Sequence, residues 1–361
     1  MSALSPVFPT ETAGPGHGPA LGRGIALALA GLALIGMALA GGARAEGAYR
    51  PGHGYDLGPL NIAGYANVVA SSQRNGPDEI VLDDLSLFVS GHFHRLVNPF
   101  IEAELADFRL VGNSSGDGSS ELVLERLYND ANITDSLTLR LGLMLAPVGE
   151  WNEIHAAPLV LSSVRPAVTY RNFSEYVTGA SVLYSPPLGD LPELQVYWQP
   201  GDELAERPDT LTSHHYNQVA GAHLAYPLGL LDKIGASLQR STDEQGVDQT
   251  LVGIDYHYTL GNVTLQGEGT YAVLDKAPTG GRDEEWGLYA AARYKISDRW
   301  SVHAWYEAFA DRNGATPAQD VLVGVGWRPL PAMIARVEYL QNVGGPGVNG
   351  TGVYASWSVL F

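Results

Sequence analysis

The side chains best suited to act on a charged or polar molecule are concentrated in one segment, residues 145–173. They comprise carboxylates, guanidinium groups, an imidazole, an amide and an indole: Glu150, Trp151, Asn152, Glu153, His155, Arg165 and Arg171. Groups of this kind attract, repel or hydrogen-bond solutes that come near them. The segment also holds Ile154, Leu159, Val160 and Leu161, which are too apolar for a freely solvated loop. We therefore expect the segment to pack against other parts of the chain.

Composition limits the chemistry that the rest of the chain can perform. The lack of cysteine excludes a disulfide framework, a thiolate metal site and a thiol nucleophile. His92 and His94 could chelate a metal because they share one face of an expected strand, but no carboxylate lies near them in the sequence. A formal net charge of −18 argues against a nucleic-acid partner, which would require a basic surface. We predict no metal site and no cofactor.

The N-terminus has the pattern of an export signal. Residues 25–40 are a continuous apolar run, Arg23 precedes it, and Ala43-Arg44-Ala45 supplies the small-x-small triplet of a cleavage site. The alternative is an uncleaved membrane anchor. We predict a cleaved signal peptide over residues 1–45, a periplasmic segment over 46–58 and a β-domain over 59–361. Cleavage would remove two arginines and one glutamate, leaving a net charge of −19.

Beyond residue 58 the hydrophobic pattern has the period of β-strands, not of helices. In the last run, Val353, Ala355, Trp357, Val359 and Phe361 fall on one face. Runs of this kind are expected near residues 60–72, 79–94, 98–110, 119–130, 136–144, 174–185, 191–198, 217–226, 232–240, 248–258, 262–274, 284–295, 299–309, 319–328, 333–341 and 352–361. An even number suits a bacterial barrel with both ends in the periplasm. The predicted fold is therefore all-β, a 16-stranded antiparallel transmembrane β-barrel.

The connections between these runs alternate in length. Counted back from Phe361, the longer ones should be external: 73–78, 111–118, 145–173, 199–216, 241–247, 275–283, 310–318 and 342–351. The shorter ones should be periplasmic: 95–97, 131–135, 186–190, 227–231, 259–261, 296–298 and 329–332. The main competitor, a soluble propeller, would show a repeat of about 40–50 residues, which the sequence lacks. Residues 145–173 thus become the third external loop.

Two segments resemble outer-membrane proteins. The ending Tyr354-Ala355-Ser356-Trp357-Ser358-Val359-Leu360-Phe361 resembles the signature that barrel assembly machinery reads. Residues 138–172, with Leu145-Ala146-Pro147-Val148-Gly149-Glu150-Trp151-Asn152, resemble porin-like proteins related to the phosphate-selective porin O and P group. The resemblance implies a porin, a homotrimer and a third loop folded into the barrel. A loop folded over the rim or into a trimer contact is the alternative.

Period-two alternation assigns ten charged residues to the pore wall: Glu102, Glu104, Arg126, Arg140, Asp255, Glu268, Arg293, Glu307, Arg336 and Glu338. A lipid-facing position would cost about 2–4 kcal/mol for an arginine at mid-bilayer. The excess of acids over arginines favours a weak cation preference. It disfavours phosphate selectivity, which would require clustered basic residues.

We therefore expect a porin of a Gram-negative outer membrane, a passive diffusion channel for small hydrophilic solutes constricted by residues 145–173. The alternatives are a channel specific for an anion, a sugar or a dipeptide, and a plugged structural or adhesive barrel. Expected partners are outer-membrane lipids, lipopolysaccharide and, through Phe361, the assembly machinery. Ser301 and His303 share the luminal face with Glu307, whereas an outer-membrane phospholipase needs such a pair on the outer face. We expect no enzyme activity.

Overall fold

The computed structural model describes residues 49–112, 120–187, 191–203, 214–275, 281–314 and 316–361. The chain divides into two compact units, of which the second, from Arg44 to Phe361, contains all described residues. The predicted signal peptide, residues 1–45, lies outside them. Within the described ranges no helix is long and apolar enough to cross a membrane.

In the described residues, eighteen β-strands make up one sheet, and the last sixteen of them form the barrel wall. The short β1 (Tyr49–Arg50) and β2 (Gly54–Leu57) precede them. The long strands are β3 (Leu60–Gln73), β4 (Asp78–Gly91), β5 (Asn98–Gly112), β6 (Glu121–Asn132), β7 (Leu137–Leu145), β8 (Tyr176–Tyr184), β9 (Glu193–Gln199), β10 (Tyr216–Pro227), β11 (Lys233–Asp243), β12 (Asp248–Leu260), β13 (Val263–Asp275), β14 (Glu284–Lys295), β15 (Trp300–Ala310), β16 (Ala318–Trp327), β17 (Met333–Gly344) and β18 (Gly352–Leu360).

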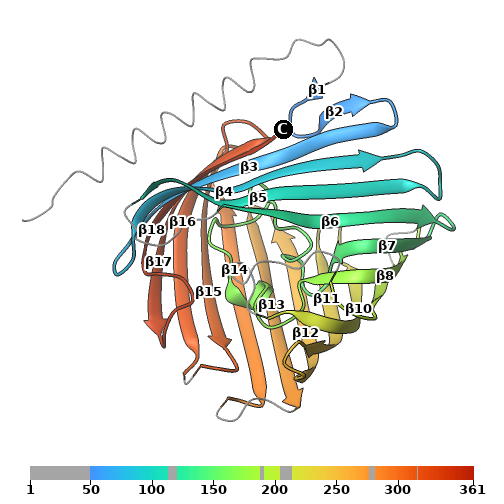
Figure 1. The fold of residues 1–361 in the computed structure, drawn as a ribbon. Coiled ribbons are helices and arrows are strands. Elements are labelled where there is room, and N and C mark those ends of the chain that lie inside the picture. The colour runs from blue at the N-terminus through green and yellow to red at the C-terminus, as the bar shows by residue number, and fades with distance from the viewer. Residues whose placement is uncertain (1–48, 113–119, 188–190, 204–213, 276–280, 315) are drawn as a thin grey trace, which may run out of the picture. The chain divides into compact units, whose positions relative to one another are not determined.

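The sixteen long strands form a closed antiparallel barrel (Figure 1). Each pairs with the next along the chain, and β18 pairs with β3 from Gly352↔Gln73 to Leu360↔Tyr65. The N–H and C=O groups of Phe361 and Gly64 exchange two hydrogen bonds of 2.9 Å, so the seam is paired up to the last residue. Among the described residues, closure gives each of the sixteen long strands a paired neighbour on both sides. The predicted sixteen-stranded barrel is confirmed. The segment 46–58 also contains β1 and β2, and β2 pairs with β3.

The outer face of the barrel is apolar and the inner face is polar. Large exposed side chains recur at every second position of the strands, such as Leu141, Val182, Val196, Leu224, Leu238, Val252, Leu288, Val323 and Val337. The intervening positions carry buried polar groups such as Gln239, Asp255 and Ser356. An apolar surface of this extent requires an apolar surrounding, which a lipid bilayer supplies.

Aromatic rings mark the end of the barrel where Phe361 lies. Trp300 and Trp327 are cross-strand neighbours with ring centroids 6.0 Å apart, and Trp357 lies 6.2 Å from Trp327. Amphipathic rings collect at the interface between lipid and water. The tryptophans therefore mark one boundary of the outer apolar belt.

The predicted alternation of loop lengths is wrong at several connections. Two connections expected to be external, 74–77 and 244–247, are tight turns, whereas two expected to be periplasmic, 92–97 and 185–192, are longer than either. Backbone pairing continues beyond the apolar alternation at the external ends of β3, β4 and β11, because ladder hydrogen bonds do not require apolar side chains. Strand β4 ends at Gly91, so His92 and His94 lie in an exposed turn and not on a strand. The third external connection, 146–175, remains the longest.

Candidate functional site in the barrel interior

The connection 146–175 crosses the interior of the barrel. The N–H groups of Glu150 and Trp151 donate to Glu268 Oε1 on β13, at 3.1 and 2.8 Å. The Val168 N–H donates to Glu307 on β15, at 2.9 Å. The connection leaves β7 and returns to β8, and β15 lies on the opposite side of the sixteen-stranded ring. A segment that bonds to inward-facing groups there has folded into the lumen (Figure 1).

Apolar packing fixes the connection against β14–β16. Trp151, Leu161, Val164 and Val168 form one buried cluster with inward-facing side chains of the wall, including Tyr289, Trp305, Phe309 and Leu322. The Trp305 indole N–H donates to Ser162 Oγ at 3.0 Å. The expectation that this segment packs against the chain is correct for Leu161 and Val160. It is wrong for Ile154 and Leu159, which are exposed because they line a small pocket beside Trp151 and Tyr289 instead of entering the buried cluster.

Three acids assigned to the pore wall hold this connection in place. Glu268 and Glu307 accept the backbone bonds described above, and Glu338 accepts from the Ser163 N–H at 3.1 and 3.2 Å and from its hydroxyl. All three side chains face inward and are buried, as alternation predicted. Each of these acids accepts at least one hydrogen bond from a backbone N–H group of the connection. We therefore expect them to fix the connection more than to attract a passing ion.

The four arginines assigned to the wall also face inward, each with a different partner. Arg126 pairs with Glu102, and Arg140 forms two bonds of 2.8 and 2.9 Å with Asp130. Arg336 is buried and donates to the carbonyl oxygens of Ala157 and Val160 in the connection. Arg293 donates to Thr264 Oγ1 at 3.3 Å.

Within the connection, the predicted constriction residues separate into two groups. Arg165 donates to Glu175, to Asn152 Oδ1 at 3.0 Å and to the Thr169 carbonyl at 2.7 Å. Asn152 is buried and donates to the carbonyls of Ala146 and Glu175, both at 2.9 Å. Arg165 and Asn152 therefore stiffen the connection.

Glu150, Glu153 and His155 form the second group, which faces charged residues of the wall. Glu150 lies 3.5 Å from Lys233 and accepts from His257 at 3.2 Å. Burial would raise the pKa of Glu150, but the His257 hydrogen bond and the Lys233 charge hold it below its usual range. Burial raises the pKa of Glu153. Arg171, the last predicted constriction residue, is half-buried beside η1 (Ala167–Thr169).

An acidic surface on β4–β6 was only partly predicted. The pairing registers skip three acids: Asp83 on β4 and Glu125 on β6 are extra residues relative to β3 and β5, and Asp107 on β5 lies unpaired opposite Asp83. Asp107 has a φ of 55°, in the left-handed region that aspartate tolerates better than most residues. A bulge lets two consecutive side chains face the same way. The adjacent charges Asp83-Asp84 and Glu125-Arg126 were the signal in the sequence that strict alternation ignores.

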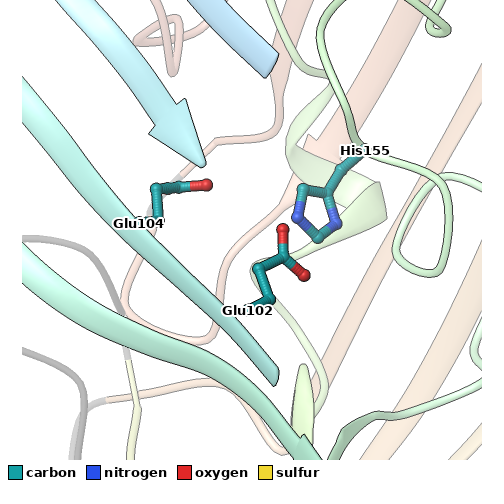
Figure 2. A group of neighbouring side chains, drawn as sticks. All are labelled: Glu102, Glu104 and His155. Carbon is teal, nitrogen blue, oxygen red and sulfur yellow. The ribbon is translucent and has the colours of Figure 1, made fainter. Parts of the chain in front are cut away.

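A cavity of about 200 Å³ lies between this surface and the connection. Its walls include Asp83, Asp84, Glu104, Asp107, Glu125 and, from the connection, His155. Glu102 and Glu104, two residues apart on β5, approach His155, and one ligand atom from each of the three lies within 4.8 Å of the others (Figure 2). In the described part of the chain this is the one group of three or more such side chains that could hold a metal. Sequence spacing could not reveal it, because His155 reaches β5 only through the inward fold.

Arg312 has a role that the sequence did not predict. Arg312, in a stretch expected to be an external loop, is only 3% exposed and bonds to Asp243, Glu285 and Gln249 at 3.0, 2.8 and 2.8 Å.

Gly112-Asn113-Ser114-Ser115-Gly116 has the Gly-x-Ser-x-Gly spacing of a nucleophile elbow. Its serines lie outside the described residues, and it connects two antiparallel strands instead of a strand and a helix, the context that this motif requires.

No protein-family model matches the sequence, and no curated protein is similar to it. Solved structures are similar in fold. A loop-deletion mutant of OmpT, an outer membrane protein of Vibrio cholerae, has a TM-score of 0.62 at 14% identity, covering 85% of this chain and 100% of that one. An anion-selective porin from Comamonas acidovorans has a TM-score of 0.57 at 13% identity, with 83% and 98% covered. The outer membrane channel DcaP of Acinetobacter baumannii has 0.55 at 15%, with 86% and 100% covered. The chain has the fold of outer-membrane porins.

Proposed function

We propose that this protein is a porin of a Gram-negative outer membrane, in which small hydrophilic solutes diffuse through a lumen narrowed by the connection 146–175. The observation that carries the proposal is the path of that connection across the barrel, held at Glu268, Glu307 and Glu338. We expect a segment fixed in this way to narrow the lumen inside the ring of strands. The fold shared with solved outer-membrane channels supports this reading.

The charge of the lumen supports a weak preference for cations. The cavity between the connection and β4–β6 has carboxylates from Asp83, Asp84, Glu104, Asp107 and Glu125 in its wall. Rings or walls of acidic side chains favour cation passage through a narrow channel. Weak cation preference is also what the excess of acids over arginines in the pore wall predicts.

Reversal potentials in a potassium chloride gradient across planar bilayers test the function and its selectivity together. We expect stable conductance with a cation-to-anion permeability ratio above one. A ratio well below one would remove the argument from charge and favour a channel specific for anions. No conductance at all would favour the plugged structural barrel.

The double variant Asp84→Asn and Asp107→Asn tests the acidic surface itself. Asparagine preserves the shape of both side chains and tolerates the left-handed backbone at position 107. We expect the permeability ratio to fall toward one with conductance retained. The matched control is Asp298→Asn, a carboxylate that is 96% exposed on a periplasmic turn and should leave the ratio unchanged.

The remaining assignments follow from the same proposal. Residues 1–45 would direct export and be removed, and Phe361 would be recognised by the barrel assembly machinery. Lipids and lipopolysaccharide would surround the apolar belt. A homotrimer is consistent with the trimer form described for Vibrio cholerae OmpT. The resemblance of residues 138–172 to the phosphate-selective group does not extend to a phosphate ligand, because the cavity is acidic. We propose no enzyme activity.

A further inference from the structure

The lumen contains a buried carboxylate oxygen that its own ion pair leaves unsatisfied. Glu102 is fully buried, and Arg126 Nε donates to its Oε2 atom. Its Oε1 atom has no hydrogen-bond partner among the described residues. An anionic oxygen buried without a partner is costly, and the cost falls when a cation binds it. Figure 2 shows this carboxylate pointing toward the His155 ring.

The imidazole of His155 is held in the form that binds metals. Its Nδ1 atom lies 2.9 Å from the Asn152 carbonyl oxygen, which can only accept, so Nδ1 carries the proton. Nε2 then has its lone pair available. A hydrogen bond from the second ring nitrogen to a carbonyl is the usual way in which proteins orient a metal-binding histidine.

Glu104 is oriented in a comparable way. Its Oε2 atom accepts from the Tyr65 hydroxyl at 3.0 Å and from Ser86 Oγ at 2.7 Å, which fixes the carboxylate at the cavity wall. Oxygen and nitrogen ligands of a transition metal lie about 2.0–2.2 Å from it, so two ligands of one ion are at most about 4.4 Å apart. The three side chains, within 4.8 Å of one another, need only small rotations to reach this spacing.

We propose that Glu102, Glu104 and His155 bind a divalent transition-metal ion on the wall of the lumen. One imidazole and two carboxylates are ligands that Zn²⁺ and neighbouring metals accept, whereas Ca²⁺ and Mg²⁺ prefer oxygen ligands alone. Asp83, Asp84, Asp107 and Glu125 in the wall of the adjoining cavity would concentrate divalent cations near the site. The inference depends on the fold of the connection and not on whether the barrel conducts.

Titration calorimetry of the full-length folded protein in detergent, with Zn²⁺ as the probe, tests the site directly. We expect one Zn²⁺ per chain in the wild type, and at least about tenfold weaker binding in His155→Asn and in Glu102→Gln. The matched control is His223→Asn, a luminal histidine paired with Asp255 at 3.1 Å, which should bind Zn²⁺ as the wild type does. An equal excess of Ca²⁺ should not displace the metal.

Three results would overturn the proposal: unchanged affinity in His155→Asn, loss of binding in His223→Asn, or displacement of Zn²⁺ by Ca²⁺. Glu102→Gln leaves Arg126 without its charged partner, so folding of that variant is checked by heat-modifiable mobility in gels. His155 lies outside the strands, so His155→Asn gives the decisive result if the other variant does not fold. A protein that binds Zn²⁺ but does not conduct would refute the porin assignment alone.

Discussion

Glu268 holds the inward-folded connection through two backbone N–H groups, and a neighbouring glycine leaves room for the carboxylate. Gly149 has a φ of 71°, and a β-carbon at this position would lie 2.0 Å from Glu268 Oε2. Neither the backbone conformation nor the space admits a larger residue. The glycine and the glutamate therefore act as one fixing point between β13 and the connection.

Replacing Glu268 with alanine should loosen the constriction. The change removes the acceptor of the Glu150 and Trp151 N–H groups, and each such hydrogen bond contributes about 0.5–1.5 kcal/mol. We expect larger open-channel current fluctuations and a lower thermal transition. Glu268→Gln, which keeps an acceptor oxygen, is the control and should show a smaller change. Steady currents in the alanine variant would mean that other contacts suffice.

For single residues, the sequence predicted which face of the barrel wall a side chain lies on more accurately than it predicted the partner of that side chain. All ten wall residues face inward, because a charge on the lipid face is costly. Their partners depend on distances across the lumen that no spacing encodes, as the bonds of Glu338 to Ser163 show. Asp83, Asp107 and Glu125 were missed because each departs from strict alternation through a local irregularity in pairing.

Strand β18 closes the barrel against β3, and Gly64 is a tightly packed point beside the terminal residue of that seam. A β-carbon at Gly64 would lie 2.3 Å from the Ser86 carbonyl oxygen and 2.8 Å from the Phe361 ring. The glycine thus leaves room for the ring of Phe361 while the backbones of the two residues pair.

Gly64→Val should impair closure. Valine is otherwise suited to an outward strand position, so the expected defect arises from the clash with backbone and ring. We expect a smaller fraction of heat-modifiable, folded barrel after refolding into detergent or lipid. Gly269→Val is the matched control, since its β-carbon would meet nothing nearer than 3.7 Å. Equal yields for both variants would show that the seam tolerates displacement.

Whole elements were predicted well from the sequence, and their ends less well. The sixteen long strands match the alternating runs because each strand has one face in lipid and one in the lumen. Strand β4 ends at Gly91 and not at residue 94, since the turn containing His92 and His94 continues the alternation without continuing the ladder. The connections at 74–77 and 244–247 were predicted too long, because backbone pairing continues there after the apolar alternation has ended.

The barrel as a whole is an apolar belt around a charged interior, so the cost of a charge should depend on its depth. Val323, near the middle of β16, is 50% exposed on the outer face. Val323→Arg should destabilise the folded barrel in lipid vesicles by about 2–4 kcal/mol. Gln319→Arg, near the external end of the same strand, should cost about 0–1 kcal/mol. Refolding titrations in urea measure both, and equal costs would contradict a bilayer location.

The connection 146–175 bonds to one part of the ring, from Gln239 on β11 through Glu268 and Glu307 to Glu338 on β17. The cavity lies on the other side, against β4–β6. If solutes diffuse through the lumen as proposed, we expect them to pass on that side, between the acidic surface of β4–β6 and the connection. A permeating cation would move along a single charged surface, so substitutions on β4–β6 should affect permeation more strongly than equal substitutions on β13–β16.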